Sequence, residues 1–138
     1  MRDIKYRMWY KSKSEMLDVE MIDFKNKHYY MENYDKWLRS YLYEDEIELM
    51  QYTGLKDKNG KEIYEGDIVL YRDWEMAYEG GGNDSFINKG MVEYCEDNCC
   101  FNVTERQTID ISDVLYKDNE DLEVIGNIYD NPELLEGK

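Results

Sequence analysis

The sequence predicts a mainly β protein, and three observations lead to that expectation. The chain of 138 residues carries 14 tyrosines, 3 tryptophans and 3 phenylalanines, which are residue types that favour strands and bury large areas. It contains 1 proline, so strands can form with few missing backbone donors. Residues 49–69 read as an apolar strand, a polar turn and a second apolar strand. The length suits one domain or two small β units.

Residues 1–48 are expected to form a β-rich N-terminal part. Apolar and polar side chains alternate over 4–10 and again over 16–24, with a polar turn between them. This alternation is typical of half-buried strands, so the two segments predict a hairpin. His28-Tyr29-Tyr30-Met31 is expected to add a third, short strand.

Two interpretations stay open for the segment before residue 44. Tyr34, Trp37, Leu38, Tyr41 and Leu42 lie at helical spacing, and this predicts a short helix over 34–43. The alternation of Tyr41-Leu42-Tyr43, taken alone, is typical of a strand.

The central segment is expected to supply the sharpest corners of the chain. Residues 47–52 predict a strand that ends near Gly54. Asn59-Gly60 is typical of a type I′ hairpin turn, in which both central residues have positive φ. Glu65-Gly66-Asp67 predicts a second corner before a strand over 68–71.

The remaining elements complete the predicted architecture of residues 49–138. About five short strands from residue 64 onward, with a long first loop and a tight middle hairpin, are the order of an SH3-like, partly open barrel. The segments involved are a glycine-rich loop over 72–89, a hairpin of 90–95 with 99–103, a strand over 108–111, a helical turn over 112–115, a closing strand over 122–129 and a tail with one helical turn over 133–136.

The net charge of the chain makes some classes of binding partner less favourable than others. With 17 Lys and Arg against 32 Asp and Glu, the formal net charge is −15. Such a charge disfavours nucleic-acid and anionic-membrane binding, since both depend on cationic side chains. It serves solubility, or it forms an acidic face that docks on a basic protein or imitates DNA. No amino-terminal apolar signal region and no membrane-spanning apolar run is present, so we expect a cytoplasmic protein without membrane contact.

Candidate metal and catalytic residues have simpler structural interpretations. Cys95, Cys99 and Cys100 lack a second ligand pair at zinc spacing, so we expect ordinary strand and turn thiols and no metal. His28 has no nucleophile pattern around it, so we expect a strand-surface histidine rather than a general base.

Carboxylates and glycines also offer weak site candidates. Four acidic side chains could gather near one end of the barrel and bind a cation, but we expect turn-forming aspartates and a solvated glutamate instead; they are Asp57, Glu65, Asp67 and Asp84. Gly80-Gly81-Gly82 does not follow the phosphate-binding pattern, so we expect no nucleotide or other cofactor.

The aromatics at the start of the long loop form the candidate binding site. Tyr71, Trp74 and Tyr78 lie there beside Asp73 and Glu75. Aromatics with neighbouring acids suit a peptide that carries proline or basic residues. The alternative is that Trp74 and Tyr78 pack this loop onto the N-terminal part or onto another subunit.

Two stretches of the chain resemble the YopX family of phage and prophage proteins. They are Leu49-Met50-Gln51-Tyr52-Thr53-Gly54-Leu55-Lys56-Asp57 with Asn59-Gly60-Lys61-Glu62-Ile63-Tyr64-Glu65-Gly66-Asp67-Ile68-Val69, and the ending from Val124 to Glu136. The opening strand with Arg7 and Trp9 is also similar, whereas 25–46 and 72–108 follow no family pattern. The resemblance implies an SH3-like barrel and a phage or prophage origin, with no established activity and no assigned site residues.

We therefore expect a non-enzymatic protein-interaction or self-assembling module that binds an unknown protein partner or a second copy of itself. The alternative is a nucleic-acid-associated accessory protein, or an acidic DNA mimic that acts on a host protein. A salt-sensitive nucleic-acid complex would distinguish the accessory protein from the interaction module.

Overall fold

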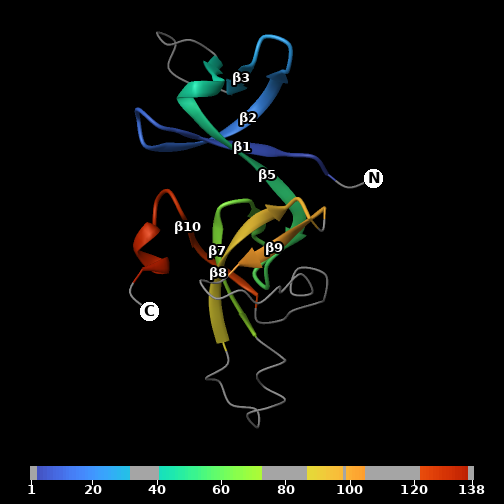
Figure 1. Cartoon of the computed structure of the whole chain (residues 1–138), viewed down its shortest axis with the longest axis vertical. Coiled ribbons are helices and arrows are strands. Elements are labelled where there is room, and N and C mark those ends of the chain that lie inside the picture. Colours follow the sequence, from blue (N-terminus) through green and yellow to red (C-terminus); the bar gives the residue numbers. More distant parts are fainter. Residues whose placement is uncertain (1–2, 32–40, 73–86, 98, 105–121, 137–138) are drawn as a thin grey trace. The chain divides into compact units, whose positions relative to one another are not determined.

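The fold was derived from a computed structural model, which describes residues 3–31, 41–72, 87–97, 99–104 and 122–136. The chain divides into two compact units, Met1–Tyr52 and Thr53–Lys138. Each unit has a hydrophobic core of its own. Figure 1 shows the strands of both units in sequence colours.

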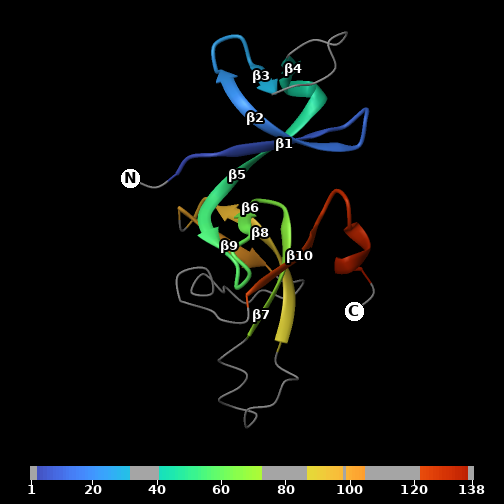
Figure 2. The same cartoon turned by 180° about the vertical axis from the view of Figure 1, so that it is seen from behind.

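The described residues form two antiparallel sheets, and no α-helix lies among them. One sheet has the strand order β4-β3-β2-β1-β5-β6, and the other has the order β10-β7-β8-β9. Figure 2 shows both sheets from behind. The elements are β1 (Tyr6–Tyr10), β2 (Glu15–Asp23), β3 (His28–Met31), β4 (Tyr41–Tyr43), the 3₁₀ turn η1 (Glu44–Glu46), β5 (Ile47–Lys56), β6 (Glu62–Tyr64), β7 (Asp67–Arg72), β8 (Ile87–Cys95), β9 (Cys100–Thr104), β10 (Glu123–Asn127) and the 3₁₀ turn η4 (Pro132–Leu135).

The first unit confirms the predicted hairpin and the third strand. β1 pairs with β2 in the register Tyr6↔Val19 to Tyr10↔Glu15, and β3 pairs with β2 on its other side. Five buried side chains of this unit form one cluster, because alternate residues of each strand face the same side of the sheet. Its members are Met8, Tyr29, Met31, Leu42 and Ile47, with Tyr10, Leu17, Val19 and Ile22 packed against them.

The helix predicted over 34–43 is wrong where the structure describes it. Residues 41–43 form strand β4, which pairs with β3. Leu42 is buried while Tyr41 and Tyr43 face the other side, so the period of two decides the local structure. The rest of the predicted helix lies outside the described residues.

Gly54 does not end its strand, contrary to the expectation from the sequence. β5 continues to Lys56, and Gly54 adopts φ 90° within it. The buried Thr53 hydroxyl donates to the carbonyl of Ile63 at 2.8 Å and accepts from the Leu55 N–H at 3.2 Å. These two bonds hold the backbone on both sides of Gly54, so pairing with β6 continues past it.

The hairpin between β5 and β6 is confirmed, but its turn type is not the predicted one. Gly60 has φ 82°, whereas Asn59 is not among the positive-φ residues of the described chain. The Gly60 N–H donates to the Asp57 carbonyl at 3.0 Å, and the Asp57 N–H donates to the Lys61 carbonyl at 2.8 Å. This is the pattern of a three-residue loop with a glycine bulge, in which only the glycine needs positive φ.

The second unit is built around the sheet β10-β7-β8-β9. Val92 of β8 lies opposite Val103 of β9, and both are fully buried. The core cluster of this unit consists of Ile63, Val69, Tyr71, Val92, Val103 and Leu122. β8 begins at Ile87, three residues before the predicted start, while the predicted elements at 108–111 and 112–115 lie outside the described residues.

The C-terminal end confirms the predicted closing strand and the single helical turn. β10 ends at Asn127, and η4 follows with Pro132 at its start. A Cβ atom added at Gly126 would lie 2.6 Å from Asn131 Oδ1 and 2.9 Å from Leu134 Cδ1. Glycine is therefore required at this position by close packing against the turn. No helix among the described residues has the length and hydropathy needed to cross a membrane.

Candidate protein-interaction site

The aromatic residues predicted to bind a peptide do not form a surface that the structure describes. Tyr71 is 0% exposed and belongs to the core of the second unit. The Tyr71 side chain therefore packs in the core and is not on the surface, where the peptide-binding prediction placed it. Trp74 and Tyr78 lie outside the described residues.

Two of the acidic residues considered as cation ligands are instead backbone acceptors. Asp57 Oδ1 accepts from the N–H groups of Asn59 and Lys61 at 2.9 Å, and Asp57 Oδ2 accepts from the Val124 N–H at 3.0 Å. Burial alone would raise the pKa of Asp57, but these N–H donors and the charge of Lys61 hold that pKa below its usual value. The carboxylate thus joins the β5–β6 hairpin to β10.

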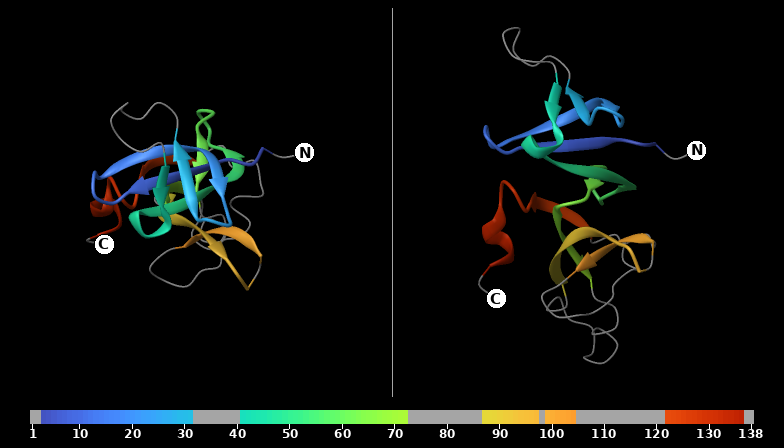
Figure 3. Two further views of the ribbon diagram at one scale, coloured as in Figure 1. Left: turned by 90° about the horizontal axis from the view of Figure 1, so that it is seen from above. Right: turned by 45° about the horizontal axis from the view of Figure 1, so that its top comes forward.

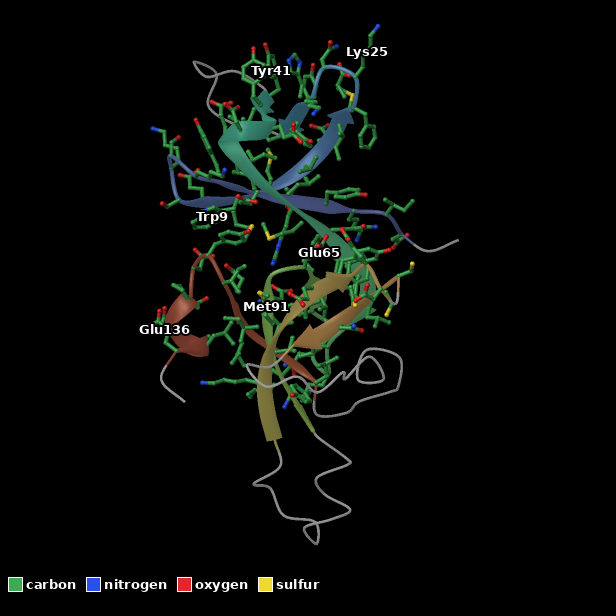
Figure 4. All side chains as sticks on the ribbon, viewed as in Figure 1. Trp9, Lys25, Tyr41, Glu65, Met91 and Glu136 are labelled. Carbon is green, nitrogen blue, oxygen red and sulfur yellow. The ribbon has the colours of Figure 1, made fainter. Side chains whose placement is uncertain are left out.

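Asp67 has a similar role at the next corner. Asp67 is buried, and its Oδ2 accepts from the Tyr64 N–H at 2.8 Å. Gly66 has φ 83°, donates to the Val92 carbonyl and accepts from the Ile128 N–H. Glu65, labelled in Figure 4, occupies this corner. Asp84, the remaining acidic candidate, lies outside the described residues.

The cysteines and the histidine belong to different units of the chain. Among the described residues, no group of three His, Cys, Asp or Glu side chains could hold a metal ion. Cys95, Cys99 and Cys100 are free thiols at the β8–β9 hairpin of the second unit. His28 belongs to β3 of the first unit, where its neighbours are tyrosines.

The first unit presents a group of aromatic side chains that sequence reasoning did not single out. β3 and β4 pair in the register His28↔Tyr43, Tyr29↔Leu42 and Tyr30↔Tyr41. The central pair is buried. The pairs on either side must therefore face the opposite side of the sheet. We call His28, Tyr30, Tyr41 and Tyr43 the aromatic face.

The four rings of the aromatic face contact one another. His28 stacks on Tyr41 with a centroid distance of 4.2 Å, and it meets the Tyr43 ring edge-on at 5.0 Å. Tyr41 lies 5.4 Å from Tyr30 and 5.6 Å from Tyr43. These separations are within the range of favourable ring pairs, so the face is ordered by its own contacts. Figure 4 labels Tyr41 on β4.

One residue of the aromatic face and two of its apolar neighbours are exposed. Met21 of β2 lies opposite Tyr30 and is 55% exposed, and Tyr43 is 41% exposed. Phe24, directly after β2, is exposed as well. Three of the six large hydrophobic residues exposed in the described chain thus belong to this end of the first unit.

Polar contacts at the edge of the face hold its backbone. The Tyr43 N–H donates to Glu46 Oε2 at 2.8 Å, and Lys27 Nζ lies 3.1 Å from Glu44 Oε2. Asp23 Oδ1 accepts from the N–H groups of Lys25 and Asn26 at 3.1 Å. The pKa of Asp23 is lowered mainly by the hydrogen bond from the Asn26 side chain and next by the hydrogen bond from the Asn26 backbone N–H.

The chemistry available at the aromatic face is recognition. Stacked and edge-on rings bind other aromatics, apolar side chains and cations. Tyrosine combines a large apolar ring with a hydroxyl, which is why it is enriched at protein interfaces. The aromatic face could have been found from the sequence if His28-Tyr29-Tyr30 and Tyr41-Leu42-Tyr43 had been interpreted as two neighbouring strands.

Comparison with known proteins gives a family and a fold. The model of the YopX protein family matches residues 5–136. The crystal structure of protein EF1440 from Enterococcus faecalis is 29% identical, with a TM-score of 0.64 over 99% of this chain and 100% of that chain. The structure of protein yopX from Bacillus subtilis is 23% identical, with a TM-score of 0.55 over 100% of this chain and 99% of that chain.

No curated protein matches the chain. The family match extends over both units and over the central and C-terminal stretches from which the resemblance was inferred. The chain belongs to the YopX family.

Proposed function

We propose that this chain is a non-enzymatic protein-interaction or self-assembling module of phage or prophage origin, acting in the bacterial cytoplasm. The observation that carries the proposal is the aromatic face, with its four contacting rings and exposed apolar neighbours. Exposed clusters of this kind on soluble proteins are typical of interaction sites. We also retain the SH3-like, partly open barrel as a proposal for the second unit. Its support is the tight β8–β9 hairpin after β7 and the return of β10 to β7.

The distribution of charge favours the first unit as the place of contact with another protein. The first unit has 9 Lys and Arg against 11 Asp and Glu, and the second unit has 8 against 21. The net charge of −15 is therefore carried mostly by the second unit. An interface on the nearly neutral unit involves less like-charge repulsion and less desolvation of charged groups.

The test is an affinity pull-down of the full chain from host lysate with and without nuclease, combined with sedimentation of the purified protein. The variants are Tyr41→Ser/Tyr43→Ser and the control Tyr94→Ser, which alters a tyrosine 46% exposed on the second unit. We expect a stoichiometric protein partner or self-association that survives nuclease. The double variant should weaken it at least about tenfold, as loss of interface aromatics does, and Tyr94→Ser should not.

Three results would contradict the proposal. A wild-type chain that is monomeric and without a partner would contradict it directly. A double variant with unchanged binding and unchanged circular dichroism would show that the aromatic face is not the contact. Binding that is lost with nuclease would support the nucleic-acid-associated alternative.

The charge of the second unit supports one other candidate function, that of an acidic mimic of nucleic acid. Its 21 acidic residues against 8 basic ones could occupy the nucleic-acid site of a basic host protein. Such a complex would weaken steeply with salt and would not respond to the Tyr41→Ser/Tyr43→Ser variant. A contact through the aromatic face would show the opposite behaviour.

A further inference from the structure

Three cysteines gather at one hairpin of the second unit, and two of them are register partners. Cys95 ends β8, Cys100 begins β9, and the two lie directly opposite each other in the antiparallel ladder. Figure 3 shows this hairpin in gold and orange. Both residues are half-buried free thiols.

The register that places these two residues together is held by the core. Val92 and Val103 form another pair of the same ladder and are fully buried. Next to the cysteines, the rings of Tyr94 and Phe101 meet edge-on with centroids 5.5 Å apart. A slip by one residue would expose the valines, so the pairing of Cys95 with Cys100 is strongly determined.

The geometry of an antiparallel pair suits a disulfide. Directly opposite residues have Cα atoms about 4.5–5.5 Å apart, and disulfides join Cα atoms about 4.4–6.8 Å apart. Opposite side chains also leave the sheet on the same face. A bond between Cys95 and Cys100 therefore needs side-chain rotation and no change of register.

Cys99 is placed differently from this pair. It lies in the turn with φ 52°, outside the ladder, and its Sγ lies 3.5 Å from the Glu96 carbonyl. Partial burial is the largest cause that raises the pKa of Tyr94, and the electrostatic interaction with the nearby Cys99 is the second. Cys99 is thus close to Tyr94, whose side chain leaves β8 on the face opposite to Cys95.

We propose that Cys95 and Cys100 are a dithiol site that exchanges with low-molecular-weight disulfides to form a reversible intrachain disulfide. One thiol loses its proton and attacks a sulfur of oxidised glutathione, which releases one glutathione thiolate and leaves a mixed disulfide. The second thiolate then attacks the protein sulfur of that mixed disulfide and releases the second glutathione. Two electrons pass from the cysteines to glutathione, and the two protons lost by the protein balance the two thiols released.

The disulfide would clamp the end of the β8–β9 hairpin, which belongs to the acidic second unit. The hairpin site shares no residue with the aromatic face, so the inference does not depend on the proposed function. The substrate class is a small disulfide, because both cysteines are only half-buried at the end of a hairpin and belong to no metal site among the described residues.

The test uses the reduced full chain equilibrated with mixtures of reduced and oxidised glutathione, then alkylated and weighed as intact protein. We expect the wild type to lose two hydrogen atoms and to retain one alkylatable thiol. Cys99→Ser is the matched control and should form the same disulfide. Cys95→Ser and Cys100→Ser should stop at glutathione adducts.

Proteolysis of the oxidised wild type provides a measurement that does not depend on any variant. Cleavage after Glu96 separates Cys95 from Cys99 and Cys100, so the expected product is a cross-linked peptide pair with alkylated Cys99. A bond to Cys99, a bond between Cys99 and Cys100, accumulation of mixed disulfides in the wild type, or disulfide formation in Cys95→Ser would overturn the proposal.

Discussion

In the second unit, buried or half-buried polar side chains hold the backbone, whereas in the first unit aromatic side chains contact one another on the sheet face opposite the core. Asp57, Asp67 and Asn131 all accept backbone N–H groups at corners of the second unit. The aromatic face of the first unit is instead formed by cross-strand ring pairs. The recognisable family stretches thus encode corners of the fold, and the candidate contact surface lies outside them.

The largest effect is expected from removing the carboxylate that accepts three backbone N–H groups in the second unit. Asp57→Ala would leave the N–H groups of Asn59, Lys61 and Val124 without their carboxylate. We expect a loss of about 3 kcal/mol in the free energy of unfolding, since bonds to charged acceptors are strong and buried donors are costly to leave unsatisfied. Denaturant unfolding measures it, and a loss below about 1 kcal/mol would show that water replaces the carboxylate.

The same residue predicts a pH dependence of stability. Because the pKa of Asp57 is lowered in the folded chain, its contribution is present above the unfolded-state pKa and is lost as the pH falls through the folded-state pKa. The stability of wild type and of Asp57→Asn should therefore converge on acidification. Parallel curves over the acidic range would refute this linkage.

The next largest effect is expected at the packing contact of the C-terminal turn. Gly126→Ala places a Cβ atom against Asn131 and Leu134, and such overpacking costs about 2 kcal/mol. Gly54→Ala is an informative comparison, because nothing lies within 4 Å of its added Cβ and only its φ of 90° opposes the change. Thermal unfolding of both variants separates packing from backbone strain, and an unchanged Gly126→Ala chain would exclude close packing there.

A smaller effect is expected at Thr53, next to the glycine within β5. Thr53→Val keeps the shape of the side chain but removes the hydroxyl that bonds Ile63 and Leu55. The expected loss is about 1 kcal/mol. Amide hydrogen exchange should become faster at Leu55 and in β6. Faster exchange confined to β1 and β2 would contradict the assignment of this hydroxyl to the β5–β6 pairing.

The smallest effect is expected at the edge of the aromatic face. Lys27 and Glu44 form an ion pair whose side chains are 65% and 58% exposed. Lys27→Met should change the free energy of unfolding by less than about 0.5 kcal/mol, because exposed ion pairs contribute little. A larger loss would show that the first unit also depends on polar contacts at its corners.

Much of the fold followed from local signals in the sequence. Alternation predicted β1 and β2, Asn59-Gly60 marked the corner at residue 60, and Gly66 marked the next corner. The turn type after Asp57 was not predictable from Asn59-Gly60, since it depends on a carboxylate whose third donor is 67 residues away in the chain. The helix prediction was wrong at residues 41–43 for a related reason. These residues form β4, which is stabilised by pairing with β3, and the local sequence does not show that pairing.

By itself, the sequence determined a β-rich chain, its family, the positions of its sharp corners and its acidic character, because these depend on residue type and short spacing. Tertiary structure alone decided that Tyr71 is buried, that His28, Tyr30, Tyr41 and Tyr43 share one face, and that Cys95 lies opposite Cys100. These facts depend on which strands pair and in which register. Register is set by the burial of residues far apart in the chain, which no local pattern contains.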